Sequence, residues 1–275
     1  MPFAELGDVR LAYSVAGSGP PLVLIHAAYV DRRMWDPQVA FLRDRYRVVT
    51  LDLRGHGETG PTSAANYSIP LFASDLAALL DHLGIERAVL CGLSLGGMVA
   101  QSFAARRPDR VEALVLANTL HHSAPTRWSR LVRDVFFPRE VLWPALRWLG
   151  MRRSTALIFW LAELSGGGIV GRRRRSSLVR DYARATLRAM SADEVAKVFE
   201  AFYHFTGVDH GGLTMPTLIL DGEEDADGIR RQARALGVLL PHASFEVIPA
   251  AGHTSALENP TAFNAALDRF LARLG

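Results

Sequence analysis

Apolar residues follow two different rhythms in the first third of the chain. Residues 21–26 (PLVLIH) and 46–53 (YRVVTLDL) are largely apolar runs, typical of strands buried on both faces of a sheet. Residues 69–84 repeat their apolar positions at helical spacing and end on Gly84, as a helix does. Strands that alternate with helices predict an α/β fold with a mostly parallel central sheet and helices on both faces. The same patterns predict strands at 9–17, 87–93 and 111–118 and a helix at 95–108.

This rhythm changes at about Thr119. From there to about Val208 the pattern is helical, and this stretch holds four of the five tryptophans. A helical block inserted between the strands of a parallel sheet is best interpreted as a cap. We therefore predict a core domain made of residues 1–118 and 209–275, with an inserted helical cap at 119–208. After the cap, the patterns predict strands beginning at 216 and 244 and helices at 229–240 and 259–275.

Composition narrows the class of protein. The 275 residues are 49% hydrophobic, enough for one large core, and a charged fraction of 21% argues against disorder. A net charge of +3 makes no strong field for nucleic acid, so we expect no such partner. Cys91 is the single cysteine, which excludes an intrachain disulfide. Without a secretory leader or a membrane-length apolar run, we expect a soluble, cytoplasmic protein.

Ser94 lies at the junction between a predicted buried strand and a predicted helix, inside Gly-Leu-Ser-Leu-Gly. A nucleophile elbow requires this context, and its sharp turn needs small flanking residues, which Gly92, Gly96 and Gly97 supply. The hydroxyl then projects beyond the carboxyl end of the sheet, where the N-terminus of the next helix favours negative charge. The alternative is a small residue in a glycine-rich turn, and the rest of the chain decides between them.

A serine nucleophile needs a base, and in this architecture the order along the chain is serine, acid, histidine. Only His242 and His253 follow a plausible acid beyond the predicted cap. His242 lies in a polar turn that we expect to be exposed. His253 follows the last predicted strand, and the small residues at 250–252 would let its loop approach Ser94. We therefore predict that His253 is the base.

The acid should follow the strand at 216–222, where five carboxylates crowd the sequence LILDGEEDADG. Asp225 lies three residues beyond Gly222, far enough to turn back toward His253, and is the predicted acid. Asp227 is the alternative. The oxyanion hole needs two backbone donors: the amide of Leu95 and one from the loop at 27–29.

These segments, PLVLIHAA, LDLRGHGET, CGLSLGG, GEED and AAGH in that order, resemble the α/β-hydrolase superfamily over nearly the whole chain. The resemblance implies that the second residue past His26, Ala28, supplies the other oxyanion amide. The family usually has His-Gly where this chain has His26-Ala27, and Thr-Pro shortly after the acid, which is missing here. A narrower resemblance, to 3-oxoadipate enol-lactonases, covers about residues 20–120.

Several other residues have simpler interpretations. We expect His56 and His26 to be structural, Cys91 to pack as a small buried hydrophobe, and His121 and His122 to serve packing or a hinge. The run Arg172 to Arg175 is typical of a solvated loop in the cap. No metal signature or phosphate-binding loop is present in the sequence, so we expect no metal and no cofactor. Residues expected to line a substrate pocket are Tyr29, Trp35, Trp128 and Phe136.

The sequence therefore predicts a serine hydrolase that cleaves carboxylic esters of small to medium, largely apolar acyl compounds. A lactonase, a cofactor-free perhydrolase, a C–C hydrolase and an acyltransferase remain alternatives, because all use the same machinery. A haloalkane dehalogenase is disfavoured, since its nucleophile would be aspartate. A ligand receptor that retains the triad is the alternative outside enzymes. The expected partner is a small-molecule ester or lactone, and a homodimer is left open.

Overall fold

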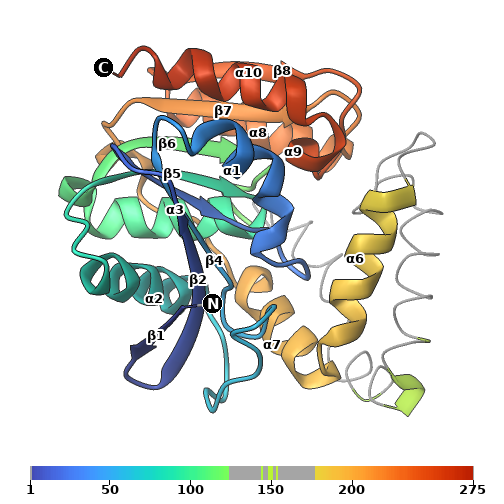
Figure 1. The fold of residues 1–275 in the computed structure, drawn as a ribbon. Coiled ribbons are helices and arrows are strands. Elements are labelled where there is room, and N and C mark those ends of the chain that lie inside the picture. The colour runs from blue at the N-terminus through green and yellow to red at the C-terminus, as the bar shows by residue number, and fades with distance from the viewer. Residues whose placement is uncertain (1, 124–143, 145–147, 151–152, 154–176, 275) are drawn as a thin grey trace.

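The computed structural model describes residues 2–123, 144, 148–150, 153 and 177–274. An eight-stranded sheet forms the centre of this part of the chain (Figure 1), with the strand order β1-β2-β4-β3-β5-β6-β7-β8. β2 pairs antiparallel with both β1 and β4, and all other neighbours are parallel. The predicted, mostly parallel sheet is therefore confirmed. The strands are β1 (Phe3–Leu6), β2 (Val9–Ala16), β3 (Pro21–Ile25), β4 (Arg47–Leu51), β5 (Ala88–Leu93), β6 (Val111–Ala117), β7 (Thr217–Gly222) and β8 (Ser244–Ile248).

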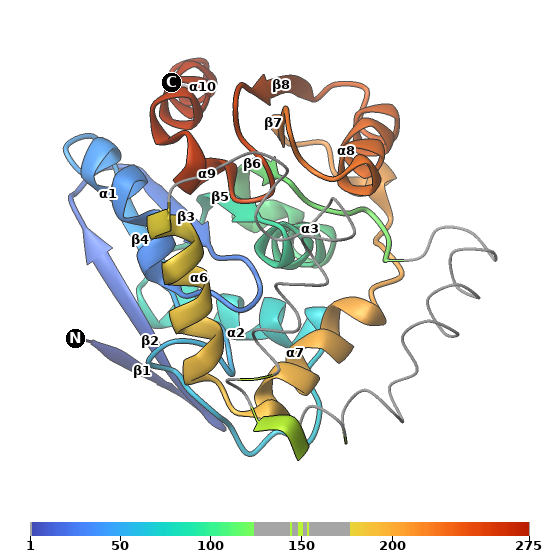
Figure 2. The ribbon, with the colours of Figure 1, turned by 90° about the vertical axis from the view of Figure 1, so that its right-hand side faces the viewer.

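Helices cover both faces of the sheet (Figure 2), as the pattern predicted. The helices α2, α3 and α8 lie on one face, and α1 and α10 lie on the other. β1 and α1 were not predicted from the sequence pattern, because four and seven residues carry too little periodicity to be recognised. The helices that cover the sheet are α1 (Asp36–Leu42), α2 (Ile69–His82), α3 (Leu95–Arg106), α8 (Asp227–Leu239) and α10 (Pro260–Leu271). The short α9 (Ser255–Glu258) precedes α10.

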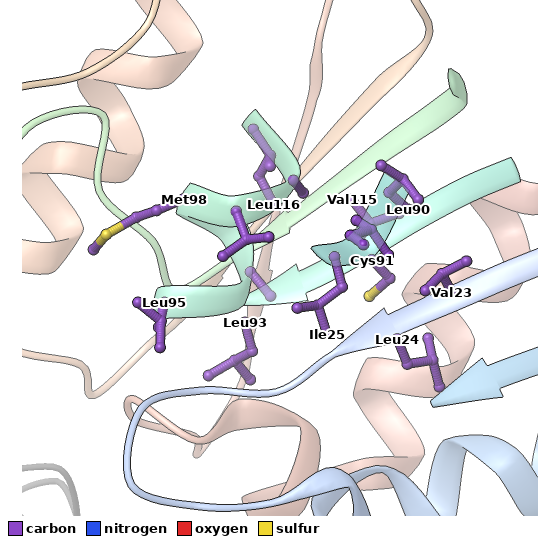
Figure 3. Close-up of a cluster of buried hydrophobic side chains, with 14 of the residues drawn as sticks. Val23, Leu24, Ile25, Leu90, Cys91, Leu93, Leu95, Met98, Val115 and Leu116 are labelled. Carbon is purple, nitrogen blue, oxygen red and sulfur yellow. The ribbon is translucent and has the colours of Figure 1, made fainter. Parts of the chain in front are cut away.

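The core centres on β3, β5 and β6. Figure 3 shows their apolar side chains packed together, with Val23, Cys91 and Val115 among them. All three residues are fully buried, so β5 and β3 are rigid supports for the turns at their carboxyl ends. Cys91 packs as the small buried hydrophobe that the sequence predicted.

Two helices of the predicted cap, α6 (Ser177–Ala189) and α7 (Ala192–Tyr203), are described. Both dock on loops at the carboxyl end of the sheet. The hydroxyl of Thr186 on α6 donates to the carbonyl oxygen of Tyr29 at 2.8 Å, after β3. The hydroxyl of Tyr67, in the segment between β4 and α2, donates to the carboxylate of Glu194 on α7. These contacts hold α6 and α7 over the end of the sheet where Ser94 lies. Within the described ranges, no helix combines the length and apolar character needed to cross a membrane.

Candidate active site

Ser94 connects β5 to α3 in a strained turn. Its backbone has φ 55° and ψ −112°, a conformation that costs a residue with a side chain about 1–3 kcal/mol. Hydrogen bonds hold the peptide units on both sides of Ser94. The amide of Ser94 donates to the carbonyl of Ala117 at 2.9 Å, and the hydroxyl of Thr119 donates to the carbonyl of Ser94 at 2.6 Å. This sharp turn between a strand and a helix has the geometry of a nucleophile elbow.

The glycines around Ser94 are required by close approach of the backbone. A Cβ on Gly92 would lie 2.2 Å from the carbonyl oxygen of Gly96, and a Cβ on Gly96 would lie 2.1 Å from that of Ile25. A Cβ on Gly97 would lie 2.6 Å from the side chain of Thr119. These distances are far below van der Waals contact, so each position excludes any larger residue. The first turn of α3 therefore lies directly against the end of β3.

His253 meets Ser94 from the loop that follows β8. Its Nε2 lies 2.9 Å from Oγ of Ser94, which is a hydrogen bond. The loop can come this close because Gly222 lets its backbone pass: a Cβ on Gly222 would lie 2.2 Å from the carbonyl oxygen of Gly252. His242, the competing histidine, is exposed as expected and contacts the carbonyl of Met215 instead.

Asp225 supports the other side of the imidazole. Asp225 lies in the turn between β7 and α8. Its Oδ2 is 3.0 Å from Nδ1 of His253. Asp227 is exposed and begins α8, so the structure brings the preferred carboxylate to His253 and not the alternative. Asp225 is buried, with its other oxygen accepting from the amide of Ala226 at 2.7 Å. The carboxylate is thereby fixed in both position and orientation.

Asp225 and His253 each favour the charged form of the other. Burial alone would raise the pKa of Asp225, but the charge and hydrogen bond of His253, with further donors from Asn118 and Ala226, hold it below its ordinary value. Burial alone would lower the pKa of His253, but the charge and hydrogen bond of Asp225 outweigh it and raise that pKa. The arrangement therefore stabilises an imidazolium next to Ser94.

The expected oxyanion donors lie on two adjoining segments. Leu95 is the first residue of α3, so its amide has no acceptor within the helix. Ala28 is partly buried in the loop after β3. Because a Cβ on Gly96 would also touch the carbonyl oxygens of Ile25 and His26, this loop and the start of α3 are neighbours. The expected donors, the amides of Leu95 and Ala28, therefore lie on adjacent segments.

Backbone strain gathers around this site. Among the described residues, the non-glycine residues with positive φ are Tyr29, Ser94, Asn118 and Ala250. They lie in the loop after β3, at the elbow, at the end of β6 and in the loop that carries His253. Strained residues persist only where the surrounding structure holds them, and they concentrate at functional sites.

The predicted pocket residues have different outcomes. Tyr29 is partly exposed, and its ring lies edge-on to Phe202 of α7 with centroids 6.3 Å apart, between the loop after β3 and the cap helix. The prediction for Trp35 is wrong. Trp35 is fully buried and packs against Phe263 of α10 with ring centroids 5.9 Å apart, so it belongs to the core. Trp128 and Phe136 lie outside the described residues, as does the arginine run at 172–175.

The other histidines near the site make contacts that support neighbouring loops and α8. Nε2 of His26 accepts from the amide of Leu53 at 2.9 Å, and Nδ1 of His56 donates to the carbonyl of Arg54 at 2.9 Å. Burial lowers the pKa of His26 to about 4 and that of His56 to about 3, so both stay neutral at physiological pH. His121 and His122 are tied through their backbone to Gln232 of α8, consistent with the packing or hinge interpretation.

Two polar residues near the site, Asn118 and Thr119, were not predicted from the sequence, and Asp221 was considered only as one of the five carboxylates around the end of its strand. Asn118 and Thr119 follow directly after β6, and Asp221 is the buried fifth residue of β7. A polar residue at the carboxyl end of a buried strand was the signal in the sequence that could have indicated a place near the site. In the part of the chain that the structure describes, no group of three or more histidine, cysteine, aspartate or glutamate side chains is placed to hold a metal ion.

A mostly parallel eight-stranded sheet with a serine elbow after its central β5 defines the α/β-hydrolase class. Residues 20–260 match the family described as alpha/beta hydrolase fold, and the chain belongs to this family. It is 28% identical to 3-oxoadipate enol-lactonase 2 of Acinetobacter baylyi over 97% of this chain and 94% of that protein. The likeness to enol-lactonases therefore extends beyond residues 20–120.

Solved structures give the same picture. An esterase from Thermogutta terrifontis superposes with a TM-score of 0.79 at 27% identity, covering 98% of this chain and 96% of that chain. The enol-lactonase from Burkholderia xenovorans LB400 superposes with a TM-score of 0.77 at 26% identity, covering 98% and 100%. The fold is thus shared with ester and lactone hydrolases along its full length.

Proposed function

We propose that this chain is a serine hydrolase that cleaves carboxylic esters of small to medium, largely apolar acyl compounds. The observation that carries the proposal is one continuous hydrogen-bond chain from Ser94 Oγ through His253 to Asp225, with distances of 2.9 and 3.0 Å. A serine, an imidazole and a carboxylate in this order are the parts of acyl-transfer catalysis. The neighbouring esterase and enol-lactonase structures support the same reaction class.

In the proposed reaction, His253 Nε2 accepts the proton of Ser94 as Oγ attacks the ester carbonyl carbon. A serine hydroxyl is a weak nucleophile without such a base. The tetrahedral intermediate collapses when the imidazolium gives this proton to the departing alkoxide, which leaves an acyl-enzyme on Ser94. Water, deprotonated by His253, then attacks the acyl carbon; the bond from this carbon to Ser94 Oγ breaks, the imidazolium returns its proton to Oγ, and the carboxylic acid leaves. Asp225 holds the imidazole in the required tautomer and stabilises its charged form.

The oxyanion of each tetrahedral intermediate would be held by the amides of Ala28 and Leu95. The first turn of α3 adds the positive end of a helix dipole at the same point. One such donor is typically worth about 3 kcal/mol in the transition state. The adjacency of the two segments, forced at Gly96, supports this assignment.

Residues 119–208 would form the cap that selects the acyl group. The docking of α6 through Thr186 and of α7 through Glu194 supports a position over Ser94. Tyr29, next to Ala28 and against Phe202 of α7, is the described residue best placed to line the acyl pocket. Trp128 and Phe136 remain proposed pocket residues.

Lactone hydrolysis is the second candidate. The relative in Acinetobacter baylyi carries the name of an enol-lactonase, and the alignment covers nearly all of both chains. A lactone is a cyclic ester, so the same attack by Ser94 opens it, and the alcohol stays tethered to the acyl group. The two candidates therefore differ in the shape of the pocket and not in the triad.

A panel of p-nitrophenyl esters from acetate to decanoate, assayed beside a panel of lactones, tests the proposal. We expect ester hydrolysis whose kcat/KM rises with acyl length and then falls once the pocket is full, with about 0.8 kcal/mol gained per buried methylene. Ser94→Ala should abolish turnover and covalent labelling by a fluorophosphonate while keeping the fold. Turnover that persists in purified Ser94→Ala would overturn the assignment. Tight ligand binding without turnover in the unaltered protein would instead indicate a receptor.

A further inference from the structure

The side chain of Asn118 occupies the junction between the acid, the histidine loop and the sheet. It follows β6 directly and is completely buried. Its backbone amide continues the sheet by donating to the carbonyl of Leu220 on β7 at 2.8 Å. Its φ of 45° is a left-handed conformation that costs energy for a residue other than glycine. A buried polar residue held in such a conformation calls for a physical reason.

The hydrogen bonds of Asn118 supply that reason. Its Nδ2 donates to Oδ2 of Asp225 at 2.9 Å and to the carbonyl oxygen of Gly252 at 3.1 Å. Its Oδ1 accepts from the hydroxyl of Ser255. Carboxylate and carbonyl oxygens only accept, so the two contacts on one side require an NH₂ group and fix the orientation of the amide. One side chain thus meets the acid and both sides of the histidine loop.

We propose that Asn118 is a positioning residue that fixes the Asp225–His253 pair in its productive geometry. The inference rests on the proposed triad. Oδ2 of Asp225 receives two donors, Asn118 and His253, so the amide sets the direction from which that oxygen meets the imidazole. Gly252 and Ser255 flank His253 in sequence, so the same amide also anchors the loop that carries the base. Only a side chain with two donors and one acceptor satisfies all three neighbours.

Asn118→Leu removes these hydrogen bonds and keeps the same number and branching of side-chain heavy atoms. We expect kcat to fall about 10- to 100-fold, the size of effect expected when a hydrogen bond to a charged group is lost, with KM changed less than about threefold. The matched control is Asn264→Leu. Asn264 is also a buried asparagine, accepting from Gln38 Nε2 at 3.0 Å, but it lies on α10 within the core. The Asn264→Leu variant should have a lower free energy of unfolding and an unchanged kcat.

A double-mutant cycle separates positioning from a general structural role. If Asn118 acts through Asp225, Asn118→Leu should cost less than about threefold in kcat once Asp225→Asn is present, because the orientation it maintains is already lost. An equal loss in both backgrounds would overturn the proposal. So would an Asn118→Leu variant whose kcat matches that of Asn264→Leu.

A measurement without substrate keeps this inference separate from the proposed function. The Nδ1 proton of His253, observed by NMR, should exchange with solvent faster in Asn118→Leu than in the unaltered protein or in Asn264→Leu. Unchanged exchange would overturn the positioning role even if Ser94 is the nucleophile. If Asn118→Leu fails to fold, the same exchange measurement is made on Asn118→Ser, which keeps one donor. Persistent hydrolysis in Ser94→Ala would overturn the proposed triad. The exchange result would still show whether Asn118 holds Asp225 and His253 in place.

Discussion

Oδ2 of Asp221 lies 3.8 Å from Nε of Arg230, within the range of an ion pair but too far for a hydrogen bond. Oδ1 of Asp221 and Nε of Arg230 are both buried and have no hydrogen-bond partner among the described residues. Burial, together with the negative charge of Asp225, raises the pKa of Asp221 to about 6 against the opposing charge of Arg230. Asp221 on β7 is thus a buried carboxyl four residues before the proposed acid, and its Oδ1 has no hydrogen-bond partner among the described residues.

Asp221→Asn should change how stability depends on pH. The pKa of Asp221 is higher in the folded protein than its ordinary value of 3.8, so the folded state binds the proton more tightly. Its contribution to stability is complete below about pH 4 and is lost as the pH rises through about 6. Relative to the unaltered protein, the free energy of unfolding of Asp221→Asn should therefore gain about 2–3 kcal/mol between pH 4 and pH 7. Urea unfolding at several pH values measures this.

Asp227→Asn is the control for that series, because Asp227 is exposed and begins the next helix. An exposed side chain contributes little to stability, so this substitution should change the free energy of unfolding by less than about 0.5 kcal/mol. Parallel curves for Asp221→Asn and the unaltered protein would show that the Asp221 carboxyl titrates as an exposed one does.

Asp225→Asn should lower kcat by about 10³- to 10⁴-fold. The neutral amide cannot stabilise the imidazolium, and it favours the wrong tautomer of His253. Asp227→Asn should change kcat less than about twofold, since its side chain is exposed. Steady-state hydrolysis of one p-nitrophenyl ester compares the two variants. If Asp227→Asn proved the inactive one, the acid of the triad would be misassigned.

The pH profile of kcat/KM should rise through a pKa above 6.5. The base must be neutral to accept the proton of Ser94, and the charge and hydrogen bond of Asp225 outweigh burial and raise the pKa of His253 above that ordinary value. Activity should therefore be lost as the pH falls through this pKa. In Asp225→Asn the residual activity should rise at a lower pH, because the stabilising charge is gone. An ascending limb that stays in place in this variant would indicate that another group is titrating.

Trp35 should matter for stability and not for selectivity. It is fully buried against Phe263, so Trp35→Ala should lower the free energy of unfolding by about 3–5 kcal/mol. Trp35→Phe keeps an aromatic ring and removes an indole N–H that has no partner among the described residues, so it should be the milder change. The acyl-length profile of Trp35→Phe should match that of the unaltered protein. A shifted optimum would place this side chain at the pocket after all.

The sequence by itself determined the features that depend on local pattern and chain order. The parallel sheet followed from apolar runs alternating with helical spacing. The elbow at Ser94 followed from glycines at 92, 96 and 97, because the clashes that require them arise within a few residues or against the adjacent strand. His253 followed from order along the chain, since few histidines lie beyond the predicted acid segment.

Only the tertiary structure decided which polar groups meet. Asp225 and Asp227 differ by two positions in a segment crowded with acids, and the turn after Gly222 buries one of them and exposes the other. Asn118 gains its place because parallel strands bring the ends of β6 and β7 and the loop after β8 to one edge of the sheet. Trp35 resembled a pocket residue by type and position, but packing against α10 made it core. Such contacts join segments far apart in the chain, so no local pattern specifies them.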